Sequence, residues 1–319
     1  MKYTILFFLL LVSVTCSGQI YQVDASGGGQ IVRYYTSDSV WSKPVGLVGI
    51  QVIAIGGGGG GASGNTLTSG SCAGGKGGGG GALTRRYIIS DSLASTYSVV
   101  IGQGGTGGVP SSTNTYNAGL DGGDTSFGSL VVADGGLGAT TVTSGGTGGV
   151  IANCVPQGLL YSVPGGNGSN GGNPNSPVAG LSTGLATTGI NGGGGGGGCT
   201  TTTPISYAGA VGGRMRDINY NQSTAPAGGV VEGGNGSNGL DNVSLQLDFL
   251  YISSAILTKG AGSGGAGGGG SNTTNGGNGG NGGLYGAGGG GGGGANRNFG
   301  NSGAGGNGAQ GICIVIEYY

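Results

Sequence analysis

The chain has 319 residues, of which 90 are glycine, and only 7% are charged, with a formal net charge of -1. Charge this sparse and balanced excludes the electrostatic surfaces by which proteins bind nucleic acid or anionic membranes. The apolar content of 35% argues against the kind of disorder that comes from high charge and low hydrophobicity.

The N-terminus is typical of a secretory signal peptide. A lysine precedes an apolar run over residues 5–12, which is too short to cross a membrane. The small residues Cys16 and Gly18 stand at the −3 and −1 positions of a cleavage after Gly18. We therefore expect a signal peptide over 1–18 and a single exported domain over 19–319, secreted or held at the cell surface. Lipidation of Cys16 is an alternative that the sequence leaves open.

Short apolar, β-branched segments alternate with glycine-rich ones along the rest of the chain. In 243–252 the apolar residues fall at every second position, as in a half-buried strand, whereas 49–55 is almost continuously apolar, as in a strand buried on both faces. No segment after the signal peptide repeats every 3.6 residues, so we expect an all-β fold. The predicted strands are 30–35, 49–55, 85–89, 97–101, 129–133, 243–252 and 312–319.

The glycine tracts need an account, because each ordered glycine loses more backbone entropy than other residues do. Within one of them the triplet Asn-Gly-Gly is repeated over 275–283. Three residues per turn is the period of an extended left-handed helix, whose N–H and C=O groups must pair with neighbouring chains. Many tracts interleaved with strands favour packed polyglycine-II helices over flexible linkers. The tracts are 56–61, 74–81, 104–108, 192–198, 264–270 and 276–294.

Four motifs in order resemble the glycine-rich domain of phage tail-tip proteins and many secreted bacterial proteins. The opening is Val-Trp-Ser-Lys-Pro-Val-Gly at 40–46, followed by the strand and glycines of 50–61. The element Ser-Val-Val-Ile-Gly-Gln-Gly-Gly ends at residue 105, Gly-Asp-Thr-Ser-Phe-Gly covers 123–128, and the chain closes on the strand of 308–318. The resemblance implies a β-framework carrying glycine-rich loops and, in similar tail-fibre adhesins, polyglycine-II helices whose loops bind a cell-surface receptor.

Two long inserts depart from that framework, at 140–164 and 200–257. The second contains the tyrosines and arginines that we consider as a binding loop, because tyrosine among Asn, Ser and Gly is typical of adaptable recognition loops. Simple covering structure is the alternative for this insert. The candidate binding residues are Tyr207, Arg214, Arg216 and Tyr220.

Four cysteines remain after the signal peptide, an even number that permits two disulfides in an exported protein. Cys72 and Cys199 both lie beside glycine tracts and form the pair that we expect to be bonded, with buried thiols as the alternative. Histidine is absent and no CxxC motif occurs, so we expect no metal site and no cofactor.

The lack of histidine also removes the commonest general base and the Ser-His and Cys-His nucleophile systems. We therefore expect a non-enzymatic extracellular structural or adhesive protein, whose rigid scaffold presents loops to a cell-surface glycan or protein. The second hypothesis is a self-assembling subunit of a filament or matrix, in which the C-terminal strand 312–319 adds to a neighbour's sheet. The third is an ice-binding protein, which requires a regular face longer than 275–283.

Overall fold

The computed structural model describes residues 18–23, 29–68, 71–140, 145–157, 162–172, 192–200, 205–214, 224–241 and 261–319. The predicted strand 243–252 and the signal peptide up to residue 17 lie outside these ranges. Over the described residues the only helical elements are two 3-10 turns, η1 (Ser90–Ser92) and η2 (Ile151–Asn153). The all-β prediction is therefore confirmed. In the same residues, no helix is long and apolar enough to cross a membrane.

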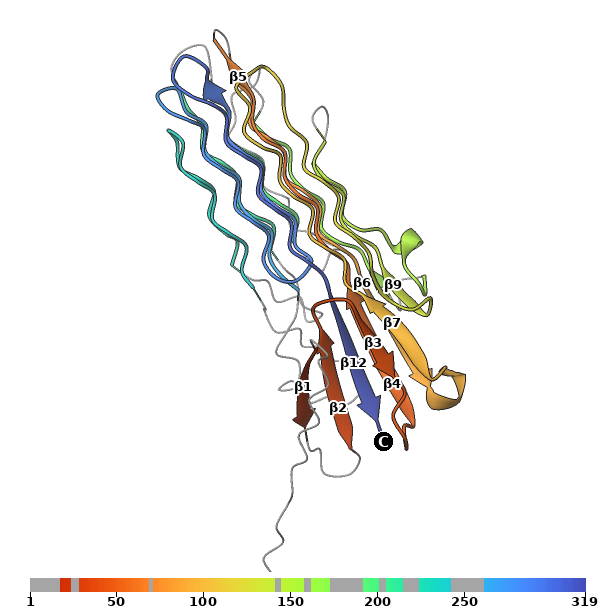
Figure 1. Cartoon of the computed structure of the whole chain (residues 1–319). Coiled ribbons are helices and arrows are strands. Elements are labelled where there is room, and N and C mark those ends of the chain that lie inside the picture. Colours follow the sequence, from red (N-terminus) through yellow and green to blue (C-terminus); the bar gives the residue numbers. More distant parts are fainter. Residues whose placement is uncertain are drawn as a thin grey trace, which may run out of the picture.

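Two antiparallel sheets form one end of an elongated molecule (Figure 1). The larger sheet has, in spatial order, β1 (Gly18–Val23), β2 (Gln30–Tyr35), β12 (Ile312–Tyr318), β4 (Gly49–Ile55), β6 (Leu83–Ile89) and β10 (Ser162–Val163). The smaller sheet has β3 (Ser39–Ser42), β7 (Thr96–Val100), β8 (Thr125–Phe127) and β9 (Val131–Ala133). A parallel pair, β5 (Thr66–Leu67) with β11 (Ala295–Asn296), lies at the opposite end.

The apolar core lies on both faces of the larger sheet. Along β4, Val52 and Ala54 belong to the cluster that faces Trp41, Phe127 and other side chains of the smaller sheet. The alternate residues of β4 and β12 pack in a second cluster on the other face. Full burial of such a side chain contributes about 1.5–3 kcal/mol, and burial on both faces explains the continuous apolar run of β4.

The C-terminal strand lies in the centre of its sheet rather than at an edge. β12 pairs along its length with β2 on one side and with β4 on the other. The prediction that 312–319 adds to a neighbour's sheet edge is therefore wrong, because its N–H and C=O groups already have partners on both sides. The outer strands of this sheet are β1 and β10.

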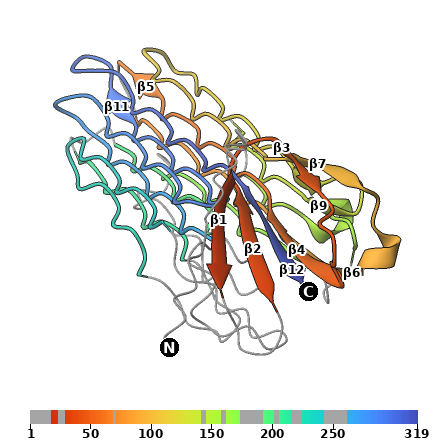
Figure 2. The same ribbon diagram turned by 60° about the horizontal axis from the view of Figure 1, so that its bottom comes forward.

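Beyond the sheets the chain runs as parallel and antiparallel extended segments, which form the glycine bundle (Figures 1 and 2). Several strands continue directly into it, as β4 does into 56–65. Residues three apart in a segment bond to the same neighbour, which is the period of a polyglycine-II helix. The described segments are 56–65, 73–82, 102–109, 117–124, 134–139, 145–149, 164–172, 192–199, 207–213, 225–229, 234–241, 261–270, 275–283, 286–294 and 301–311.

Segment 56–65 shows how the bundle is held together, because it is surrounded on all sides. Its N–H groups donate at 2.8–3.2 Å to three antiparallel neighbours, 73–82, 117–123 and 303–309. Its carbonyls accept from three parallel neighbours, 102–108, 134–139 and 286–294. All its N–H groups and most of its carbonyls are thus paired without a sheet, as buried backbone requires.

Glycine is required where a segment faces a neighbour, because the neighbour's backbone occupies the place of a side chain. A Cβ at Gly60 would lie 2.1 Å from the carbonyl oxygen of Thr106, and one at Gly61 would lie 2.1 Å from that of Gly290. Side chains are tolerated at every third position of a surface segment, which points outward. The triplet of 275–283 follows this rule, with exposed asparagines and inward glycines.

Two stretches of the chain have more detail in the bundle than the sequence indicates. The tract 276–294 is two antiparallel segments with a turn between them, since 275–283 and 286–294 both pair with 261–270 in opposite directions. The described parts of the expected insert 200–257 are bundle segments, as shown by the bonds of Gly209 and Gly212 to 226–229. Mixed composition concealed these segments, because the outward positions carry ordinary residues.

We expect Gly60→Ala to lower the free energy of unfolding by about 3 kcal/mol or more, because the new methyl group overlaps a carbonyl that cannot move alone. Gly29→Ala is the matched control, since its Cβ would lie 3.8 Å from the nearest side chain. Chemical denaturation followed by circular dichroism measures both. Equal stability of the two variants would contradict the close packing of the bundle.

Candidate functional site

Three polar features stand out in the described part of the chain: a buried carboxylate between the sheets, a carboxylate at the far end of the bundle, and a row of amides along one face. The buried carboxylate is Glu317 of β12, which has no solvent exposure. One of its oxygens, Oε1, accepts from Arg33 Nε and from Trp41 Nε1, both at 2.7 Å. The other, Oε2, accepts from the Tyr319 hydroxyl at 3.0 Å.

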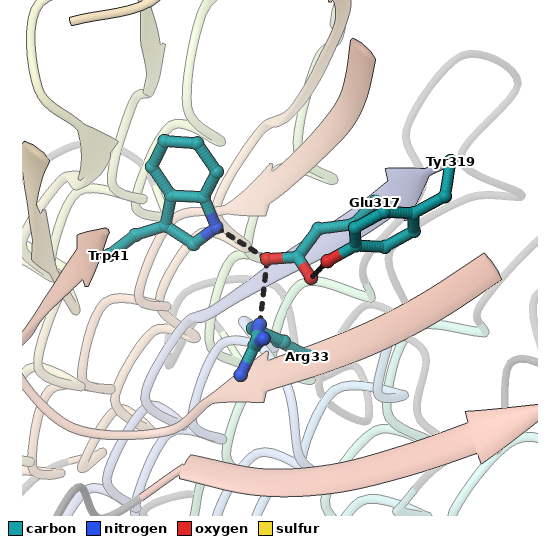
Figure 3. Close-up of polar contacts among 4 residues, drawn as sticks. All are labelled: Arg33, Trp41, Glu317 and Tyr319. Atoms are coloured by element: carbon teal, nitrogen blue, oxygen red, sulfur yellow. Dashed lines mark hydrogen bonds and ion pairs between the residues drawn. The ribbon is translucent and has the colours of Figure 1, made fainter. Parts of the chain in front are cut away.

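This cluster joins three strands and two sheets. Arg33 comes from β2 and Trp41 from β3 of the smaller sheet, and Figure 3 shows them converging on one carboxylate oxygen. Burial alone lowers the pKa of Arg33, but the hydrogen bond and charge of Glu317 outweigh it and raise that pKa. Both oxygens of the carboxylate have donors, and it lies in the interior, so the geometry suits a clamp between sheets rather than a reactive acid.

The second carboxylate, Glu232, lies in a turn at the far end of the bundle. It is the non-glycine residue that the structure shows with positive φ, at 60°, a conformation that is uncommon for such residues. The hydroxyls of Ser206, Ser271 and Thr273 donate to its carboxylate, as does the Asn272 N–H. These bonds tie three turns of the far end to one charged group.

The pKa of Glu232 follows from the same contacts. Partial burial raises it, but the hydrogen bonds from Ser206, Thr273, Asn272 and Ser271 outweigh burial and lower the pKa below its ordinary value. Hydrogen bonds to the charged form have this effect. The carboxylate therefore holds the turns together in its ionised form.

The third feature is a row of exposed asparagines along one side of the bundle, on segments 234–241, 275–283 and 301–311. Six of the side-chain oxygens accept a hydrogen bond from a backbone N–H of the next segment. For example, the Asn278 N–H donates to Asn235 Oδ1 at 2.8 Å, and the Ala304 N–H donates to Asn278 Oδ1 at 2.9 Å. Two shallow hollows of about 450 and 490 Å³ lie along the same side. The side chains of this polar surface are held in fixed orientations by these contacts.

Comparison with known families agrees with this architecture. A family model described as "Glycine-rich domain" matches residues 35–319. The chain belongs to the glycine-rich domain family. A comparison with curated proteins gave no match. The family membership confirms the glycine-rich part of the resemblance, and it carries no information on a ligand or an adhesive role.

Of the predicted binding residues, the structure of this glycine-rich domain describes Tyr207 and Arg214, which lie apart. Tyr207 and Arg214 lie at the two ends of one extended segment, about 22 Å apart at 3.1 Å per residue. Tyr207 is half-buried beside Cys199, and Arg214 is exposed. Arg216 and Tyr220 lie outside the described residues. Arginine and tyrosine composition drew attention to this segment, whereas the asparagine row could have been found from its three-residue spacing.

The cysteines of this glycine-rich domain at positions 72, 154, 199 and 313 are all buried. Burial raises the pKa of Cys313 to about 12. Cys72 and Cys199 lie on neighbouring extended segments, since the Thr200 N–H donates to the Cys72 carbonyl at 2.9 Å. The disulfide between them stays a prediction. Among the described residues, no group of three His, Cys, Asp or Glu side chains is arranged to hold a metal ion.

We expect Glu317→Gln to lower the free energy of unfolding by about 3 kcal/mol, because it leaves Arg33 half-buried without a counter-charge. Trp41 is the one tryptophan of the chain, so its fluorescence reports this site directly during denaturation. Asp121→Asn is the matched control: it makes the same carboxylate-to-amide change but keeps the exposed acceptor of the Gly138 N–H. A loss of less than 1 kcal/mol would argue against the clamp.

We also expect Glu232 to make the far-end turns sensitive to acid. Because its pKa in the folded protein is below the unfolded value of about 4.3, its contribution is present above that pH and is lost as the pH falls through the folded pKa. The difference in melting temperature between the parent and Glu232→Gln should therefore shrink between about pH 5 and pH 3. A difference that is constant over this range would contradict the assignment.

Proposed function

We propose that this glycine-rich domain is a non-enzymatic extracellular adhesin, in which a rigid glycine bundle holds recognition turns away from the sheets and against a cell surface or receptor. The observation that carries the proposal is that three of its exposed apolar side chains lie together at the end of the bundle. Val109, Val230 and Phe299 are 65%, 70% and 60% exposed. All three lie in turns where bundle segments reverse at the end farthest from the sheets. We call these turns the distal tip.

Rigidity supports the same proposal. Turns that are anchored at both ends by hydrogen-bonded segments lose little conformational entropy when they bind. The Glu232 contacts add a further restraint within the tip. An aromatic side chain held exposed on such a platform is the kind of anchor that contributes most to binding at an interface.

The expected signal peptide supports a location outside the cell, and the resemblance to tail-tip adhesins supports receptor binding by the turns. Both arguments come from the sequence, so the experiment must test binding directly. The alternative of a filament subunit now depends on the outer strands β1 and β10, since β12 has two neighbours. Negative-stain microscopy at rising concentration distinguishes the two, because a filament subunit elongates and an adhesin stays as single particles.

We expect Phe299→Ser to weaken retention of the labelled domain on a panel of bacterial and eukaryotic cells by about 10- to 30-fold, as loss of an aromatic anchor does. Val45→Ser is the matched control, since Val45 is 98% exposed and lies in the loop before β4, at the sheet end. Flow cytometry measures retention, and circular dichroism checks that both variants fold. Equal retention of the two variants, or no retention by the parent on any cell type, would contradict the proposal.

A further inference from the structure

The asparagine row is part of a continuous surface, which we call the amide face. Four segments lie next to one another along it in the order 234–241, 275–283, 301–311 and 102–109. Direct backbone hydrogen bonds join each segment to the next. For example, the Gly236 N–H donates to the Asn278 carbonyl at 2.9 Å, and the Gly305 N–H donates to the Gly108 carbonyl at 2.8 Å. The face is therefore as rigid as the bundle itself.

The asparagines on this face have one defined orientation. Their Oδ1 atoms cover the outward N–H groups of the adjoining segment, which have no backbone partner on the solvent side. The Nδ2 atom of each asparagine is thus left toward solvent with two N–H donors. In each of these hydrogen bonds a side-chain Oδ1 accepts from a backbone N–H at 2.8–2.9 Å. The acceptor and donor residues are, in that order, Asn235 and Asn278, Asn238 and Asn281, Asn275 and Asn301, Asn278 and Ala304, Asn281 and Asn307, and Asn307 and Gly107.

Donors on one segment recur every three residues, which corresponds to about 9.3 Å along an extended three-residue helix. The amide face thus presents a repeating set of hydrogen-bond donors along the bundle axis. At its sheet end, Gln103 and Gln310 donate their Nε2 groups to the carbonyls of Ile101 and Thr36. This leaves their Oε1 atoms as acceptors.

Both shallow hollows are on the amide face, and together they extend along it from tip to sheets. The distal hollow, of about 450 Å³, is lined by residues that include Asn235, Asn275, Asn278 and Asn301. The hollow at the sheet end, of about 490 Å³, includes Asn281, Asn307, Gln103 and Gln310. None of the lining residues of either hollow is charged.

We propose that the amide face binds an uncharged polysaccharide chain lying parallel to the bundle segments. The Asn Nδ2 groups donate hydrogen bonds to its hydroxyl oxygens, and the glutamine Oε1 atoms accept hydrogen bonds from its hydroxyls. The regular spacing of the donors along the bundle suits a polymer of repeated sugar units. This inference rests on the proposed function and names the partner class of a second surface beside the distal tip.

Other partner classes fit this surface less well. Nucleic acid and acidic polysaccharides need cations, whereas the exposed carboxylate of Asp241 and, beside the distal hollow, that of Glu232 repel them. A protein interface of ordinary stability has an apolar or aromatic centre, whereas the lining here is mainly amides and backbone. Each hydrogen bond contributes only about 0.5–1.5 kcal/mol, so binding requires several sugars in register.

The chain itself supplies a substitution that removes the donors and keeps the scaffold. Elsewhere on the bundle, aspartates accept hydrogen bonds from outward N–H groups as the asparagines do. The Gly138 N–H donates to Asp121 Oδ1 at 2.7 Å, and the Gly135 N–H donates to Asp124 Oδ1 at 2.9 Å. Asn278→Asp with Asn281→Asp therefore retains both Oδ1 acceptors, removes the Nδ2 donors and introduces two negative charges.

Asn167→Asp with Asn170→Asp is the matched control. These residues cover the N–H groups of Gly148 and Gly145 at 2.8 and 3.1 Å, on segment 164–172, which contributes nothing to either hollow. The control makes the same chemical change with the same net charge. Any general effect of added charge on the domain therefore appears equally in both double variants.

The probes are cellulose, chitin, β-1,3-glucan, α-mannan and dextran, with polygalacturonate as an anionic comparison. Pull-down with the insoluble polymers and calorimetry with soluble oligosaccharides of increasing length measure binding. We expect the parent domain to bind at least one neutral polymer, with affinity that rises with oligosaccharide length. The Asn278/Asn281 double variant should lose at least tenfold in affinity, and the Asn167/Asn170 double variant should bind as the parent does.

Several outcomes would overturn the inference. They are no binding to any neutral polymer, equal loss in both double variants, preference for polygalacturonate, and thermal hysteresis that the Asn278/Asn281 variant abolishes while sugars do not bind, which would make ice the partner. If cell retention is lost in Phe299→Ser but no neutral polymer binds, the inference fails and the proposed adhesin stands. If polymers bind but Phe299→Ser retains cells as Val45→Ser does, the proposed tip fails and the amide face stands.

Discussion

Contact between backbone and backbone determines most of this molecule. In the bundle, the position that a Cβ would take at Gly58, Gly61 or Gly64 is within 2.3 Å of a carbonyl oxygen from segment 286–294. A side chain at any of these positions would separate the two segments and break the hydrogen bonds between them. The high glycine content is thus a packing requirement of inward positions, and the rest of the composition is what the outward positions and turns allow.

That requirement makes the sheets necessary. An ordered glycine costs about 0.5–1 kcal/mol more than alanine in backbone entropy, and a net hydrogen bond contributes a similar amount. Because ordering the backbone of any residue already costs about 1–2 kcal/mol, hydrogen bonds alone do not stabilise an isolated glycine segment. The apolar clusters around β4 and β12 provide the additional stabilisation, and the strands that continue into the bundle set the direction and register of its segments. The Glu317 clamp, which joins the two sheets, stabilises the base from which the segments extend.

The sequence predicted the strands better than the bundle, for a physical reason. β2 and β4 were predicted with the observed bounds, because apolar periodicity reports burial directly. Segments such as 234–241 and 301–311 were missed, since only their inward positions must be glycine and the outward ones carry Asn, Ala or Leu. Among the candidate site residues, Tyr207 and Arg214 were chosen for their chemistry, but a single sequence does not show that an extended segment holds them far apart. The central place of β12 depends on pairing with β2 and β4, which are remote in sequence.

The outward positions have a freedom that bears on function. An outward residue must satisfy only the N–H of the adjoining segment, and both asparagine and aspartate do so in this bundle, as Asn167 and Asp121 show. Their remaining atoms face solvent in fixed positions, so the character of a whole face can change without disturbing the inward glycines. The distal tip has the same freedom in its turns. A scaffold whose specificity resides in positions that do not hold it together can diversify its ligands at little cost in stability, and this separation is the physical basis for expecting recognition at two distinct surfaces of one bundle.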